Sequence, residues 1–167
     1  VLALHGLDVV GVRASTIDGV AVDEFRMAAS SGGTPDWSRI ERDLRAALAG
    51  ELDVESRLDA KLRQQSKRRR PQAAVEPRLE VLVSNDASDS TTVVEVRAPD
   101  APAVLYRLAH ALSGLQLDIR SAVVATLGHE VVDVFYVTVA DPSGSAVQVP
   151  DSEFERIRTG LRAALIA

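Results

Sequence analysis

The chain has 167 residues and a net charge of −5, and it contains no cysteine. The absence of cysteine excludes disulfides, thiolate metal sites and cysteine nucleophiles. The acidic balance argues against general nucleic-acid binding, and no apolar run approaches the roughly 20 residues that a helix needs to span a bilayer. Three scattered histidines do not form a metal-binding pattern. We therefore expect no metal, membrane or nucleic-acid site.

A segment near the amino end recurs in the second half of the chain. Residues 7–27 align without a gap with residues 117–137, with identities at Leu7/Leu117, Asp8/Asp118, Thr16/Thr126, Val22/Val132, Asp23/Asp133 and Phe25/Phe135. A second block, RIERDLRAALA from Arg39, matches RIRTGLRAALI from Arg156. Two collinear blocks indicate a duplication. The offset rises from 110 to 117 between them, which predicts extra residues in the second copy's loop around Asp141–Gly144.

The second copy predicts three strands. Residues 91–98 are rich in β-branched residues, and residues 117–126 and 131–139 continue this pattern on either side of a turn at 127–129. A turn this short predicts an antiparallel hairpin.

Two helices are predicted between and after these strands. Residue 100 precedes an apolar stripe at helical spacing: Leu105, Leu108, Ala109 and Leu112. Asp100 is suited to capping this helix, with Pro102 in its first turn. Residue 150 precedes a second stripe: Phe154, Ile157, Leu161, Ala164 and Leu165. The first copy repeats that second stripe as Trp37, Ile40, Leu44, Ala47 and Leu48, after a loop in which Asp36 is placed to cap the helix.

The order β-α-β-β-α lacks one strand of a ferredoxin-like βαββαβ unit. The expected fold class is α+β, with two such modules whose antiparallel sheets carry helices on one face. Residues 78–84, in which Leu79, Val81 and Val83 alternate, supply a further strand. This strand could close the first module or pair with 91–98 across a short loop, and the short loop favours the pairing.

Three segments divide the chain. We expect a first module over residues 1–50 that lacks its first strand and most of its first helix, because residue 1 corresponds to Ala111, late in the equivalent helix; upstream residues are therefore expected. Residues 51–77 form a basic, partly helical linker, and residues 78–167 form the second module. The run Lys67–Arg70 is interpreted as a solvated helix end, favoured by the helix dipole, or as an anion or partner contact.

No catalytic constellation is visible. There is no G-x-x-x-x-G-K-S/T phosphate loop, no G-x-G-x-x-G fingerprint, and no acid pair or triad. Asp23 and Asp133 occupy matching positions in V-D-x-F. Each could face a ligand, but a solvent-exposed or ion-paired strand position is the favoured interpretation.

The most specific segment is VEVRAPDAPAVLYRLAHALSGLQLDIRSAVVATLGHEVVDVFYVT. It resembles an ACT domain, a small regulatory module that binds amino acids at inter-domain interfaces. Its LDIRSA, ATLG and VVDVFYV runs are similar to the paired C-terminal ACT domains of the PII uridylyltransferase/uridylyl-removing enzyme family.

The resemblance implies a non-catalytic segment that senses an amino acid, above all glutamine, and allosterically controls a cytoplasmic enzyme of nitrogen metabolism. That parent would carry a nucleotidyltransferase domain and a hydrolase domain that uses divalent metal, and it would modify the PII signal protein by uridylylation or, in some relatives, adenylylation. This segment itself would hold no cofactor. The oligomeric state stays open, with a homodimer as one alternative, because exposed sheet edges in such modules invite pairing. The alternative is an ACT-type pairing module that binds a protein without a small molecule.

The resemblance also implies ligand positions. In the second copy these are the loop and helix start, with Asp100, Ala103, Val104 and Leu105; a neighbour's second strand adds Asp118 and Ile119, or Asp8 and Val9 in the first copy. Many members carry Gly where Ala103 stands, so its methyl group would crowd a ligand. The two acids, Asp8 and Asp118, would either meet the ligand's ammonium group or only end a turn.

Overall fold

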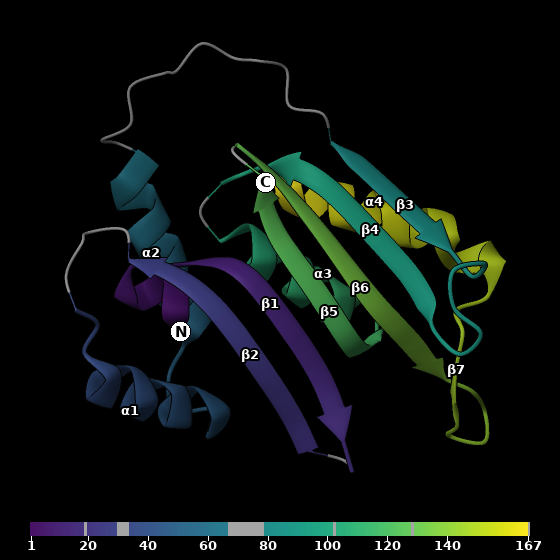
Figure 1. Ribbon diagram of the computed structural model, residues 1–167, viewed down its shortest axis with the longest axis horizontal. Helices are drawn as coiled ribbons and strands as arrows, with labels where there is room; N and C mark the ends of the chain where they lie inside the picture. Colours follow the sequence, from purple (N-terminus) through teal and green to yellow (C-terminus); the bar gives the residue numbers. More distant parts are fainter. Residues whose placement is uncertain (19, 30–33, 67–78, 102, 128, 167) are drawn as a thin grey trace. The chain divides into compact units, whose positions relative to one another are not determined.

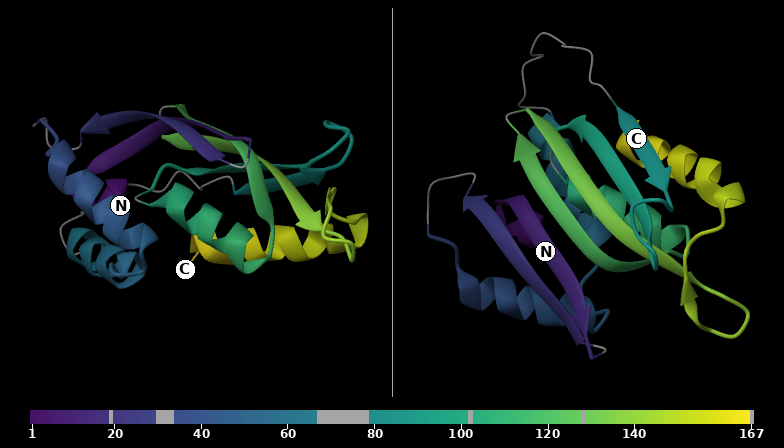
Figure 2. Two further views of the ribbon diagram at one scale, coloured as in Figure 1. Left: turned by 90° about the horizontal axis from the view of Figure 1, so that it is seen from below. Right: turned by 45° about the vertical axis from the view of Figure 1, so that its right-hand side comes forward.

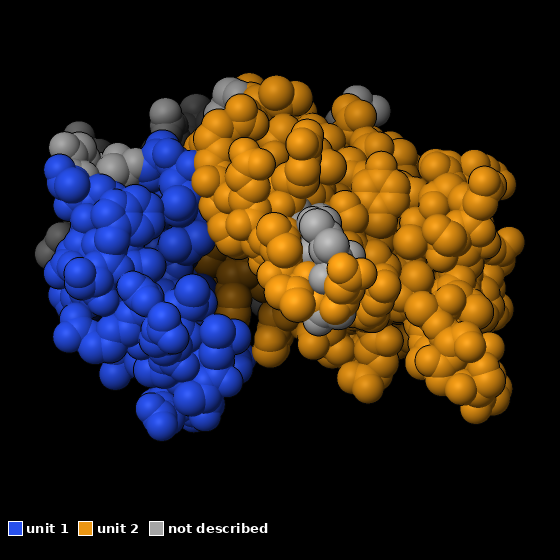
Figure 3. Space-filling model, turned by 60° about the horizontal axis from the view of Figure 1, so that its bottom comes forward, with its two compact units in different colours: residues 1–9, 27–75 blue, residues 10–26, 76–167 orange. Residues whose placement is uncertain are grey.

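The computed structural model describes residues 1–18, 20–29, 34–66, 79–101, 103–127 and 129–166. The chain divides into two compact units (Figure 3), residues 1–9 with 27–75 and residues 10–26 with 76–167. The basic run Lys67–Arg70 lies outside the described residues, as does Pro102. No helix within the described ranges is long and apolar enough to cross a bilayer.

The larger unit contains the second copy, whose helices and strands are labelled in Figure 1. Its main elements are β3 (Glu80–Ser84), β4 (Thr92–Pro99), α3 (Val104–Gly114), β5 (Asp118–Leu127), β6 (Glu130–Ala140) and α4 (Phe154–Ile166). The strands are antiparallel in the order β5-β6-β4-β3. This α+β arrangement is the expected one and is consistent with a ferredoxin-like module. β3 pairs with β4, as the short loop between them favours.

The core lies between this sheet and the helices α3 and α4, which cover one face of it (Figure 2). Successive side chains of a strand point to opposite faces, so Val94, Val96 and Ala98 of β4 are all buried. The predicted helical stripes meet them with Leu108 and Leu112 of α3 and with Ile157 and Leu161 of α4, each fully buried.

Polar contacts fasten the segment between β6 and α4. This segment includes β7 (Ala146–Val147) and η2 (Asp151–Glu153). The buried Thr92 hydroxyl donates to Asn85 Oδ1 at 2.6 Å and accepts from the Val149 amide at 2.7 Å. The predicted loop insertion is a turn in which Asp141 Oδ1 accepts from the amides of Ser143 and Ser145, both at 2.8 Å.

The hairpin of the first copy adds two strands to the same sheet. These are β1 (Leu7–Ile17) and β2 (Val20–Ala29), and the sheet order continues as β2-β1-β5. β1 lies antiparallel to β5, with Arg13 opposite Val123. These two residues occupy equivalent positions in the repeat. The pairing is therefore self-complementary, and the duplicated strands meet about a local two-fold axis.

The described residues of the smaller unit include η1 (Leu2–His5), α1 (Trp37–Leu48) and α2 (Val54–Ser66). Asp36 caps α1, as predicted, by accepting from the Arg39 amide at 3.1 Å. Asp53 precedes α2 and accepts from the Ser56 amide at 3.0 Å. Ile40 of α1 and Leu58 of α2 are both buried.

Candidate functional site

The loop between β4 and α3 brings four of the predicted ligand residues together. Asp100 is exposed, and its amide donates to the His129 carbonyl at 2.8 Å. The expectation that Asp100 caps α3 is wrong, because the helix begins at Val104 and Ala103 occupies its N-cap position without a side-chain hydrogen bond. The start of α3 therefore has no side-chain cap.

Ala103 has a left-handed backbone, with φ 64° and ψ 20°. This conformation costs a residue with a Cβ atom about 1–2 kcal/mol, whereas glycine adopts it freely. Val104 is 6% exposed and belongs to the core, and Leu105 packs against that core while half-buried. These two side chains anchor the helix start.

Asp118 and Ile119 lie at the opposite end of the same module. Asp118 is opposite Thr138 on β6, whereas Pro99 of β4 is opposite Glu130. The separation of eight residues along β6 corresponds to about 27 Å. One module thus does not bring Asp118 to Asp100. Asp118 is exposed and its Oδ2 accepts from Arg120 Nη1 at 2.9 Å; Ile119 is half-buried.

Asp8 and Val9 lie on β1 in the smaller unit. Asp8 is exposed and Val9 is half-buried. Burial lowers the pKa of Lys61 of α2, and the negative charge of Asp8 partly opposes this effect.

Asp133 is the unexpected residue of the larger unit. It is 1% exposed, and neither carboxylate oxygen has a hydrogen-bond partner among the described residues. Burial, and after it the charge of Asp100, raises the pKa of Asp133 to about 7. The favoured interpretation of an exposed or ion-paired position is wrong for Asp133, although the equivalent Asp23 is exposed. The signal was present, since Asp133 alternates with the buried residues Val131 and Phe135.

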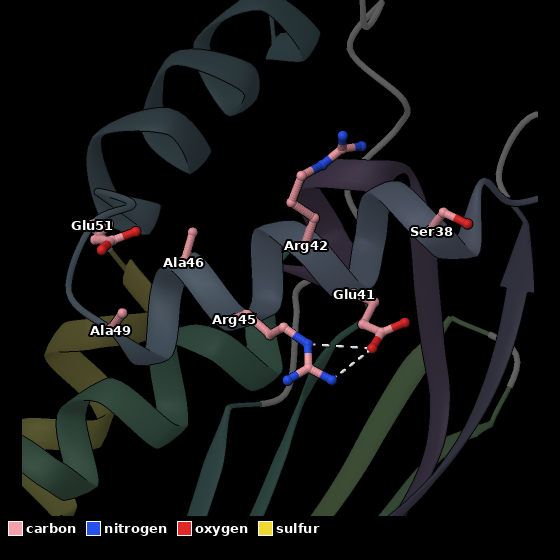
Figure 4. A pocket seen from close by; sticks show the side chains of 7 residues that line it. All are labelled: Ser38, Glu41, Arg42, Arg45, Ala46, Ala49 and Glu51. Carbon is pink, nitrogen blue, oxygen red and sulfur yellow. Dashed lines mark hydrogen bonds and ion pairs between the residues drawn. The ribbon is translucent and has the colours of Figure 1, made fainter.

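A hollow of about 480 Å³ runs along α1 (Figure 4). Arg45 and Glu41 point toward one another across it and form an ion pair of 2.7 Å, Nη2 to Oε1. Both side chains are largely exposed, so the pair contributes little to stability. This hollow offers no convergent chemistry.

A second hollow of about 420 Å³ lies in the smaller unit and is charged. It is lined by Leu4, His5, Gly6, Arg39, Asp43, Arg57 and Lys61. His5 Nε2 lies 2.9 Å from Asp43 Oδ2. Sequence reasoning missed this cluster because its members come from three separate elements. The repeat alignment carried one signal, since His5 and Asp43 correspond to Leu115 and Gly160 in the second copy.

The described residues contain no group of three or more histidine, aspartate or glutamate side chains placed to hold a metal ion. The candidate for ligand binding in the larger unit is the β4–α3 loop with Asp100, whose charge acts on the buried Asp133 of β6.

No family model matches the chain. Curated relatives do match it, and all three of the following are bifunctional uridylyltransferase/uridylyl-removing enzymes. The Streptomyces coelicolor enzyme is 39% identical over 172 residues, with 99% of this chain and 20% of the relative covered. The Gluconobacter oxydans enzyme is 34% identical over 169 residues, covering 98% and 17%, and the Azospirillum brasilense enzyme is 36% identical over 148 residues, covering 81% and 15%. The chain thus spans a fifth or less of the length of these relatives, and the resemblance to their family is confirmed.

Proposed function

Since the chain is homologous, over nearly its whole length, to a segment of the bifunctional uridylyltransferase/uridylyl-removing enzymes, we propose that it is a regulatory, non-catalytic ACT pair of such an enzyme. It senses an amino acid, with glutamine the leading candidate. The observation that carries the ligand class is the combination of the uncapped start of α3, the exposed Asp100 in the loop before it, and the buried Asp133 on β6, opposite Val96.

The start of α3 is suited to binding the carboxylate group of a ligand. α3 begins without a side-chain cap, its Val104 amide donates to the Ala101 carbonyl at 3.3 Å, and the amino end of a helix carries the positive end of its dipole. A ligand carboxylate is the kind of group that binds there. The left-handed Ala103 turns the backbone immediately before these amides.

Asp100 and Asp133 are suited to binding the ammonium group of a ligand. Asp133 is buried without a partner among the described residues, and the charge of Asp100 acts on it. A buried carboxylate without a counter-charge is costly, and a ligand ammonium would offset that cost. A free α-amino acid carries both groups, so it matches the loop better than a simple anion or cation does.

The pairing of β1 with β5 supports a regulatory role. It joins the duplicated strands β1 and β5 in one sheet, and we infer that this shared ladder is the route by which binding at one copy would affect the other. A ligand shifts the parent only by its differential affinity for two arrangements. In the proposed parent, a cytoplasmic enzyme, such a shift would select between transfer to and removal from the PII protein, and the divalent metal would belong to the catalytic part.

Isothermal calorimetry with glutamine and a panel of other amino acids tests this proposal. We expect saturable glutamine binding that Asp100→Asn weakens by about tenfold or more, because a charge-assisted contact contributes roughly 1.5–3 kcal/mol. Asp89→Asn is the matched control, since Asp89 is an exposed acid in the β3–β4 loop. Flat heats for every amino acid, with a circular dichroism spectrum that shows an intact fold, would remove the proposal.

A second candidate is a pairing module that binds a protein without a small molecule. The methyl group of Ala103 at a left-handed position favours it, because that group crowds the loop where a ligand would lie. Flat heats for all amino acids, together with retained binding of purified PII protein to the chain, would favour this candidate over the first.

A further inference from the structure

Three elements line the charged hollow of the smaller unit. η1 contributes His5, α1 contributes Arg39 and Asp43, and α2 contributes Arg57 and Lys61. The lining therefore holds two arginines and one lysine against one carboxylate, in a chain whose net charge is −5. Such a local excess of positive charge attracts anions.

Lys61 is positioned before any ligand arrives. Its ammonium group donates to the carbonyls of Ala3 at 2.6 Å and Leu4 at 3.0 Å. Burial lowers the pKa of Lys61, and the charge of Asp8 only partly opposes this effect. A half-buried ammonium group that carries a desolvation cost is stabilised by an anion placed beside it.

The two guanidinium groups are available. No ion pair among the described residues involves Arg39 or Arg57, although the charge of Arg57 acts on the exposed Asp53. The second copy provides the contrast: Arg156, the equivalent of Arg39, pairs with Glu153. In the first copy the position of Glu153 is taken by Asp36, which instead caps α1 through the Arg39 amide. The guanidinium of Arg39 has thus lost the acid that its counterpart retains.

The single acid of the hollow is itself engaged. Asp43 Oδ2 lies 2.9 Å from His5 Nε2, so the hydrogen bond to the imidazole holds this carboxylate in place. Asp43 still repels an anion, and this repulsion makes its removal informative.

We propose that this hollow binds a phosphate group, which is distinct from the amino-acid site of the larger unit. A phosphate offers several acceptor oxygens to match two guanidinium forks and an ammonium point charge. The phosphate could be free or esterified to a nucleoside, and the chemistry of recognition is shared. The exposure of both arginines means that binding weakens as salt screens it.

The test is a titration of the whole chain with inorganic phosphate, pyrophosphate and uridine monophosphate, at an ionic strength kept constant with sodium chloride. We expect saturable shifts in an amide NMR spectrum for at least one probe. The double change Arg39→Gln with Arg57→Gln should weaken binding about tenfold or more, and Asp43→Asn should tighten it severalfold. Arg162→Gln, an exposed arginine of α4 that does not line the hollow, should leave affinity unchanged.

The three probes also distinguish a free phosphate ion from a nucleotide phosphate. A clear preference for uridine monophosphate over both inorganic probes would assign a nucleotide, whereas equal or better binding of an inorganic probe would assign the free ion. Non-saturable titrations for all three probes, or equal weakening in the double variant and in Arg162→Gln, would overturn the site. The glutamine titration depends on Asp100, whereas the phosphate titration depends on the residues of the hollow. The outcome of the first therefore does not decide the outcome of the second.

Discussion

The helices α1 and α4 descend from the same repeated motif but bury different amounts of it. Ile40 and Ile157 are equivalent and are both buried, at 5% and 0% exposure. Four residues further on, Leu44 is 47% exposed whereas Leu161 is fully buried. α4 packs against α3 and β3 within its unit. The comparison teaches that an apolar stripe specifies a helix face, while the neighbouring elements decide how much of that face is buried.

The helices η1 and α3 precede the equivalent strands β1 and β5. Their carboxyl ends have the same backbone conformation but differ at one pair of contacting residues. Gly6 and Gln116 are equivalent, and both have left-handed backbones, with φ 72° and 61°. The leucines that follow them are both buried. In the second copy Gly160 lies against Leu115, so that an added Cβ would be 3.2 Å from Leu115 Cδ1. In the first copy the same positions hold the His5–Asp43 contact, and tight apolar packing has been exchanged for a polar pair.

The largest difference is expected at the two equivalent leucines. Leu161→Ala should lower the free energy of unfolding by about 3 kcal/mol, because it removes a fully buried side chain and leaves a cavity. Leu44→Ala should cost less than about 1 kcal/mol, since that side chain already contacts water. Urea unfolding followed by far-UV circular dichroism measures both. Equal losses would show that the two copies are packed alike.

The second difference is expected at the two equivalent aspartates. The pKa of Asp133 is raised from its ordinary value of 3.8 to about 7 in the folded protein. Below about pH 4 the carboxyl is protonated in both states and carries no penalty. Stability is then lost as the pH rises to about 7, and above that pH the ionised group penalises the folded state by a constant amount. A shift of this size corresponds to about 4 kcal/mol at most.

Asp133→Asn should therefore stabilise the protein at pH 8 by about 2 kcal/mol, which is less than that limit because the amide also lacks partners. Its advantage should shrink as the pH falls toward 4. Asp23→Asn, at the exposed equivalent, is the matched control and should have almost no effect. Urea midpoints from pH 4 to pH 8 measure the profile. A stabilisation that does not change with pH would contradict the titration of Asp133.

The smallest difference is expected at the left-handed residues. Gln116→Gly should stabilise the protein by about 0.5–1 kcal/mol, because glycine adopts this conformation without strain. Gly6→Ala should destabilise it by about 1 kcal/mol. A Cβ added at Gly6 would have Lys61 Nζ as its neighbour, at 3.9 Å. The destabilisation would therefore come from backbone strain and not from crowding. Thermal unfolding measures both changes, and a stabilising Gly6→Ala would show that the two helix ends are not equivalent.

Much of the secondary structure was predictable because it depends on local pattern. The period-two alternation of β4 and the apolar stripes of α3 and α4 placed these elements correctly, and Asp36 was recognised as a cap from its position before α1. The cap of α3 was predicted wrongly, since Asp100 looks suitable in sequence but Ala103 turns the backbone first. The sign of φ at a single alanine is not encoded in a hydropathy pattern.

The amino-acid sequence by itself determined the duplication, the order of strands and helices and the family resemblance, because each of these depends on residue identity along the chain. Only the tertiary structure decided that Asp133 is buried while Asp23 is exposed, and that His5, Arg39, Arg57 and Lys61 line one hollow. Burial and long-range charge depend on what the fold places beside a side chain, and two copies of one motif can therefore differ in both.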